Sequence, residues 1–180
     1  MRTVGVTLAA LLLLTGCDDA GAHPQAAPST APAAAAGGAC QLLDFAVVNA
    51  KLGLDLAVAA SATQDNTFTC VLQPRAATAP DLVLSVSATT IGADIYTSAV
   101  QPKGAAPVEG LGAAAYQQPT PATDGTGHGT GPGAEVGWLA GNKRIIQLSV
   151  HLASGTPEDK SAELLPKLVA LAKLIDLSSL

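Results

Sequence analysis

The chain of 180 residues has few aromatic and few charged side chains. Phe, Trp and Tyr make up 3% of the sequence, and Asp, Glu, Lys and Arg make up 13%, with a formal net charge of -5. Proteins that bind nucleic acid carry a basic patch or stripe, and many add aromatic side chains that stack on bases. Because the sequence has neither pattern, we do not expect nucleic acid as a partner.

The sequence also lacks, near its start, a hydrophobic run long enough to span a bilayer. The apolar run from Val4 to Leu14 has 11 residues, and it follows a single basic residue, Arg2. As a helix it would rise roughly 16 Å, whereas a bilayer core is about 30 Å thick and needs ~20 residues. A basic residue before a short apolar run is typical of a signal peptide. We therefore expect residues 1–16 to target the chain for export.

The end of this run, Leu14-Thr15-Gly16-Cys17, resembles a bacterial lipobox. The alternative is an ordinary signal peptide that happens to contain a cysteine. The lipobox resemblance implies that a diacylglyceryl group is attached to the sulfur of Cys17 and that cleavage makes Cys17 the first residue. Two acyl chains give stable anchoring, whereas one gives only marginal binding. We therefore expect a lipid-anchored protein on the outer, extracytoplasmic face of the cell membrane.

Only three cysteines are present, so lipidation of Cys17 leaves one pair, Cys40 and Cys70. Outside the cytoplasm such a pair is more often a disulfide than a reduced dithiol, and a metal site would need further Cys or His ligands. We expect a Cys40–Cys70 disulfide, and neither a metal nor a cofactor.

The segment between Cys17 and Cys40 is rich in alanine and proline and nearly lacks bulky apolar side chains. We expect residues 17–39 to be the lipidated cysteine and a linker, with His23 in solvent. As a flexible coil it would span on the order of 25 Å. Residues 40–180 have the usual size of one domain.

Hydrophobic spacing predicts the elements of this domain. A helix is expected from Asp44, as N-cap, to Gly53, and strands are expected over residues 66–73 and 81–90. Weaker patterns suggest a short helix over 91–100 and a strand over 108–118. A hairpin is expected over 135–152, with its turn at Gly141-Asn142. A terminal helix is expected to start at Thr156 and Pro157, to be kinked by Pro166, and to bury one stripe of residues: Leu165, Leu168, Val169, Ala172 and Leu174 or Ile175.

This order predicts an α+β fold, with an antiparallel sheet of about five strands and the N- and C-terminal helices packed on one face. Cys40-Gln41-Leu42-Leu43, then Cys70 on a strand, then Gly110-Leu111-Gly112 followed by Ala113-Ala114-Ala115-Tyr116, resemble the uncharacterised secreted lipoprotein domains of actinobacteria. The resemblance covers most of residues 40–176. It implies fold and location and leaves function open, because the family has no established activity.

No catalytic constellation emerges from the sequence. Gly129-x-Gly131-x-x-Ala134 matches a dinucleotide fingerprint in spacing, but a strand pattern follows it where a helix is needed. Asp124 and Glu135 are separated by flexible glycines, so nothing holds two carboxylates at a fixed distance. Two histidines, His128 in the glycine-rich loop 123–133 and His151 on the polar face of a strand, are expected to be surface residues.

The scarce aromatic residues are the remaining candidates for a binding site. Tyr96, Tyr116 and Trp138 are expected to be core residues, and the alternative is that Trp138 and Tyr116 line a binding surface. The leading functional hypothesis is a non-enzymatic binding or accessory module of the cell envelope, whose partner is an envelope protein or a cell-wall component. A carrier of a lipid or other apolar ligand is the alternative, and a hydrolase is the third.

The lipobox interpretation predicts the outcome of replacing Cys17 with alanine. Wild-type protein from its native host should lack residues 1–16, carry a diacylglyceryl group and incorporate a palmitate analogue. Cys17→Ala should incorporate none, because its side chain has no sulfur to acylate, whereas Cys40→Ala should still be labelled. Intact-mass analysis and metabolic labelling measure this, and wild-type protein that retained Met1 or a bare Cys17 thiol would contradict it.

Overall fold

The computed structural model describes residues 32–123 and 131–178. The predicted signal peptide, Cys17 and His23 lie outside these ranges, as do Asp124, His128 and Gly129. Within the described ranges no helix combines the length and the apolar character needed to cross a bilayer.

Within the described residues, seven antiparallel strands form one sheet in the order β1-β2-β3-β7-β6-β5-β4. The α+β class is therefore confirmed, although the number of strands is larger than the five expected. The strand bounds are β1 Val58–Gln64, β2 Thr67–Gln73, β3 Asp81–Ala88, β4 Ala106–Pro107, β5 Ala114–Thr120, β6 Gly133–Ala140 and β7 Arg144–His151. β1 was missed because most of its side chains are small and exposed, so they show no alternation of apolar and polar residues. β4 was missed because it has only two residues.

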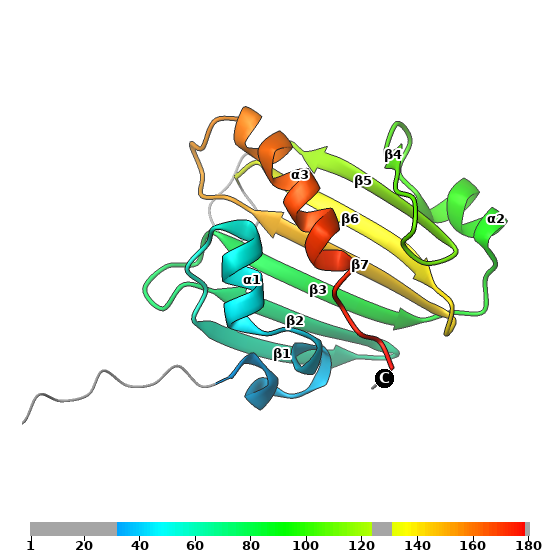
Figure 1. Ribbon diagram of the computed structural model, residues 1–180, viewed down its shortest axis with the longest axis horizontal. Coiled ribbons are helices and arrows are strands. Elements are labelled where there is room, and N and C mark those ends of the chain that lie inside the picture. The colour runs from blue at the N-terminus through cyan, green and yellow to red at the C-terminus, as the bar shows by residue number, and fades with distance from the viewer. Residues whose placement is uncertain (1–31, 124–130, 179–180) are drawn as a thin grey trace, which may run out of the picture.

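Two helices cover one face of the sheet (Figure 1). They are α1 (Phe45–Leu52) and α3 (Asp159–Ala172), and they pack against each other as well as over the strands. The expected ends of α1 are confirmed. Asp44 accepts a hydrogen bond from the backbone N–H of Val47 at 3.0 Å, and Gly53 ends the helix in the left-handed conformation with φ of 72°.

A third, short helical segment lies at one end of the sheet. It consists of α2 (Ala93–Ile95) followed by one π-helical turn, η3 (Tyr96–Val100), where the sequence predicted a short helix. Its Tyr96 packs with Tyr116 and Leu139, at the corner formed by β5 and β6.

The pairing register assigns every strand residue to one of two faces. Cys70, Leu84, Leu148 and Val136 lie opposite one another on β2, β3, β7 and β6, and all are fully buried beneath the helices. The intervening residues point to the other face, where Ser85 pairs with Gln147 and Thr69 pairs with Ser85. Apart from the corner near Tyr96 and the paired Val71 and Val83, this second face carries mainly polar and small side chains, and we call it the uncovered face.

The terminal helix differs from its prediction at its start and in its buried stripe. α3 begins at Asp159, and the hydroxyl of Thr156 donates to the carbonyl oxygen of Ala153 instead of capping the helix. The buried side chains are Ser161, Leu164, Leu168, Leu171 and Ala172. Leu165 and Val169, expected in the core, are only partly buried because they face the edge of the sheet at β5.

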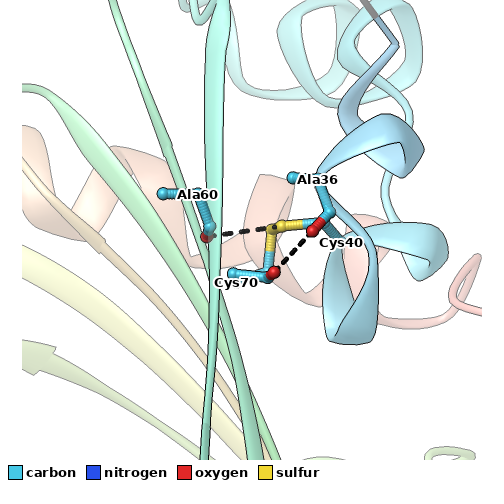
Figure 2. The surroundings of a disulfide bond; sticks show 5 residues. Ala36, Cys40, Ala60 and Cys70 are labelled. Atoms are coloured by element: carbon cyan, nitrogen blue, oxygen red, sulfur yellow. Dashed lines mark hydrogen bonds between the residues drawn. A yellow bond between two sulfur atoms is a disulfide. The ribbon is translucent and has the colours of Figure 1, made fainter.

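The predicted Cys40–Cys70 disulfide is present (Figure 2). It joins β2 to a short 3-10 segment, η2 (Gly38–Leu42), and both cysteines are fully buried. Sγ of Cys40 lies 3.4 Å from the carbonyl oxygen of Ala60 on β1. The bond therefore holds the start of the domain against the covered face, near the end of the sheet that α3 does not reach.

The compact part of the chain begins before Cys40. A 3-10 turn, η1 (Ala33–Ala36), precedes η2, and Ala33 and Ala39 are 1% and 0% exposed. The hydroxyl of Ser61 on β1 donates to the carbonyl oxygen of Ala36 at 2.5 Å. Residues 32–39, which the sequence assigned to the linker, therefore pack on the domain through alanines small enough to fit against β1.

Removing the disulfide should destabilise the fold substantially. The two cysteines are 30 residues apart, and closing a loop of this length stabilises a protein by roughly 3 to 4 kcal/mol in the chain-entropy model. Urea unfolding of Cys40→Ala/Cys70→Ala should show a loss of this size, with Cys17→Ala as the common background so that lipid does not complicate the measurement. A loss below about 1 kcal/mol would contradict the prediction.

Candidate binding face

The two aromatic residues proposed to line a binding surface do not share one. Ala115 and Trp138 are paired across β5 and β6, as are Tyr116 and Gly137, so Trp138 and Tyr116 point to opposite faces. Trp138 is 2% exposed on the covered face, and Tyr116 is 4% exposed on the other. Both are core residues, as expected from the sequence, and they do not line a shared binding surface.

A polar cluster centred on Glu135 lies on the uncovered face. Oε1 of Glu135 accepts hydrogen bonds from the Tyr116 hydroxyl at 2.7 Å and from Nε2 of Gln118 at 3.2 Å, and Oε2 accepts one from Nε2 of Gln147 at 2.7 Å. The three donors come from β5 and β7, which flank β6 on either side. Hydrogen bonds to an ionised group are shorter and stronger than those between neutral groups. The cluster is therefore held in a fixed arrangement, with Gln147 exposed at its outer side.

A glycine allows Tyr116 to reach this cluster. A Cβ atom at Gly137 would lie 2.6 Å from Cζ of Tyr116, so the ring lies directly over the glycine backbone. The ring also packs against Tyr96, with centroids 6.3 Å apart. Burial raises the pKa of both phenols well above their usual value, and the Glu135 carboxylate raises them further. Tyr116 therefore remains a hydrogen-bond donor at physiological pH.

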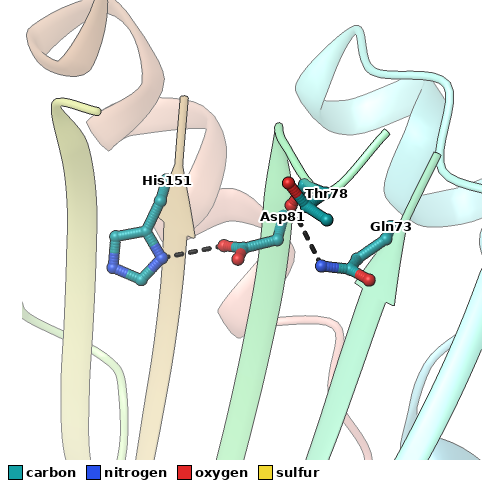
Figure 3. Close-up of polar contacts among 4 residues, drawn as sticks. All are labelled: Gln73, Thr78, Asp81 and His151. Atoms are coloured by element: carbon teal, nitrogen blue, oxygen red, sulfur yellow. Dashed lines mark hydrogen bonds and ion pairs between the residues drawn. The ribbon is translucent and has the colours of Figure 1, made fainter. Parts of the chain in front are cut away.

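His151 and Asp81 form a second polar feature of the same face (Figure 3). Nδ1 of His151, at the end of β7, lies 2.8 Å from Oδ1 of Asp81, at the start of β3. Asp81 is 1% exposed, and the His151 side chain is 23% exposed. A carboxylate in this position orients the imidazole ring, as in hydrolytic triads. In the described part of the chain, however, no Ser or Thr hydroxyl is hydrogen-bonded to this ring.

The remaining candidates from the sequence do not form a site. Gly131 precedes β6, so a strand stands where a dinucleotide fingerprint requires a helix. Gly129 of the fingerprint lies outside the described residues, as does Asp124, the carboxylate considered as a partner of Glu135. Residues 32–123 and 131–178 contain no group of three or more His, Cys, Asp or Glu side chains placed to hold a metal ion.

An open groove lies between α3 and the β4–β5 edge of the sheet. Its volume is about 590 Å³, within the usual range of small-molecule sites. The residues that line it come from α3 and from the β4 and β5 segments: Gly104, Ala106, Gln117, Gln118, Pro119, Ala162, Leu165, Pro166 and Val169. We call this the α3 groove.

The sequence suggested neither Glu135 as a cluster centre nor the α3 groove. Glu135 was weighed only against Asp124, whereas its hydrogen-bond partners lie on the two strands that flank β6. Leu165 and Val169 have the spacing of core residues, and only the position of α3 over the sheet distinguishes them.

Comparisons of the chain with protein-family models, with curated proteins and with solved structures found no match.

The two buried tyrosines predict a loss of stability at high pH. Their pKa is about 10 when unfolded and higher when folded, so their contribution is complete below pH 10 and is lost as the pH rises further. The free energy of unfolding should fall by up to about 1.4 kcal/mol per pH unit for each tyrosine. Urea unfolding from neutral pH to about pH 11 measures this fall.

The chain has only two tyrosines, which makes the attribution direct. Phenolate absorbance should appear together with unfolding, and Tyr116→Phe should make the alkaline loss of stability less steep. Phenolate formation near pH 10 in the folded protein would show that the rings are accessible and would contradict the prediction.

Proposed function

We propose that this protein is a lipid-anchored, extracytoplasmic binding module of the cell envelope, and that it acts without catalysis. The lipobox at Cys17 supports the anchor. The disulfide supports an oxidising compartment, because such bonds persist mainly outside the cytoplasm. The resemblance to actinobacterial lipoprotein domains is part of the same proposal.

The observation that carries the binding role is the preorganised polar cluster on the uncovered face. Glu135 is fixed by three hydrogen bonds, so a partner that binds there need not order it. Its two oxygens are already engaged, which suits an acceptor in a recognition surface better than a catalytic base. Around it the strands present Ser85, Thr69 and Gln147, groups that hydrogen-bond to peptide amides or to sugar hydroxyls. An envelope protein or a cell-wall component has this chemistry.

Two other roles have weaker support. A carrier of an apolar ligand is the second candidate, and the α3 groove favours it. A hydrolase is the third, and its only support is the oriented His151 beside Asp81. A hydrolase would also need a nucleophile and donors that stabilise an oxyanion.

Photo-cross-linking from defined positions tests the binding role. A photoreactive residue is placed at Ser85 or at Gln147 on the uncovered face, and at the exposed Ala170 on α3 as the matched control. In the native host, the two positions on the uncovered face should capture the same partner, and Ala170 should not.

Equal capture from all three positions would indicate random collision at the membrane, and no reproducible adduct from Ser85 or Gln147 would overturn the proposal. Glu135→Leu should reduce capture severalfold, because the two glutamine amides then lose their common acceptor. Circular dichroism and urea unfolding distinguish this loss from unfolding of the domain.

A further inference from the structure

We infer that the α3 groove binds an uncharged amphiphile with an apolar chain and a hydroxyl or amide donor, such as the acyl-glycerol portion of a neutral lipid. None of the nine residues that line the groove carries a charge. A charged headgroup placed against these residues would therefore lose part of its hydration without finding a counter-charge. The site would serve the carrier alternative, and Gln118 is the one residue that it shares with the Glu135 cluster.

The helix wall supplies both the apolar surface and one unusual polar group. Leu165 and Val169 provide partly buried aliphatic side chains, and Pro166 lies between them in the interior of α3. Proline has no backbone N–H, so the carbonyl oxygen of residue 162, four positions earlier, lacks its helical hydrogen bond. Ala162 and Pro166 are both exposed and both line the groove, so we place this acceptor at the groove wall.

The opposite wall, at the β5 edge of the sheet, is poorly suited to pair with an added polypeptide strand. β4 pairs only with Tyr116 and Gln117, so the rest of the β5 edge has no neighbouring strand among the described residues. Pro119 lies in this part of β5, and proline at an edge removes a donor that an added strand would need. Gln117 pairs with Val136, so its amide points to the same face as α3 and offers a second polar contact.

An apolar groove, a carbonyl without its usual partner at position 166 and the amide of Gln117 together specify the ligand chemistry. The chain of the ligand lies along Leu165, Val169 and Pro119, and its hydroxyl donates to the carbonyl oxygen of Ala162. The volume of about 590 Å³ accommodates one chain with a small headgroup.

Binding of monodecanoylglycerol to the purified full chain tests this inference, with decanoate as a probe that has the same chain and a negative charge. Isothermal titration should show binding of monodecanoylglycerol at least tenfold tighter than that of decanoate. Ala162→Leu, which adds an isobutyl group at the groove wall, should weaken binding at least tenfold. Ala170→Leu adds the same group to an exposed position of α3 outside the groove and should leave binding unchanged.

Pro166→Ala separates a binding effect from a folding effect. It restores the N–H at position 166, so the carbonyl of Ala162 regains its helical partner and the urea midpoint should rise. The same change should weaken monodecanoylglycerol binding roughly three- to tenfold, because the acceptor becomes engaged.

Absence of binding, equal affinity for decanoate, or an unchanged affinity in Ala162→Leu would overturn the inference. An unchanged affinity in Pro166→Ala would overturn the role of the carbonyl. None of these outcomes bears on the partner of the uncovered face, which is measured by cross-linking.

Discussion

Burial of one face of the sheet under α1 and α3 is the constraint on which the rest of the structure depends. Leu82, Leu84 and Val86 on β3 and their partners on β7 are fully buried, and α3 lies over β5, β6 and β7. Because side chains alternate along a strand, burying one face assigns every other residue to the opposite face. The positions of Glu135, Gln147 and His151 therefore follow from the packing of residues that they do not contact.

The same burial explains the position of the disulfide. α3 packs over β5 to β7 and α1 packs beside it, which leaves the covered face of β1 and β2 to the short turns η1 and η2. Those turns consist mainly of alanine and glycine, whose small side chains bury little apolar area and contribute correspondingly little to stability. The Cys40–Cys70 bond compensates, since it attaches this weakly packed segment to β2.

Local patterns in the sequence predicted those features that depend on a few residues close together in the chain or on a single residue type. Asp44 and Gly53 delimit α1, the count of three cysteines predicted the Cys40–Cys70 disulfide, and alternation located β2, β3 and β7. Features that depend on contacts between distant segments were not predictable in this way. The Glu135 cluster needs Gly137 to admit the Tyr116 ring, and nothing near position 137 indicates which ring that is.

Leu165 and Val169 show this limit most clearly and also connect the fold to the proposed ligand site. Their helical spacing is that of core residues, but the sheet ends beneath them at β5, and β4 extends it by only two residues. A proline between them costs a helix interior about 3 kcal/mol. If both faces of the helix were covered, the carbonyl of Ala162 would also be buried without its usual partner, and its desolvation would destabilise the fold further. At the edge of the sheet Ala162 is exposed and lines the open α3 groove, so water or a ligand hydroxyl can approach its carbonyl. The short edge of the sheet therefore makes Pro166 tolerable, and it also leaves the groove open.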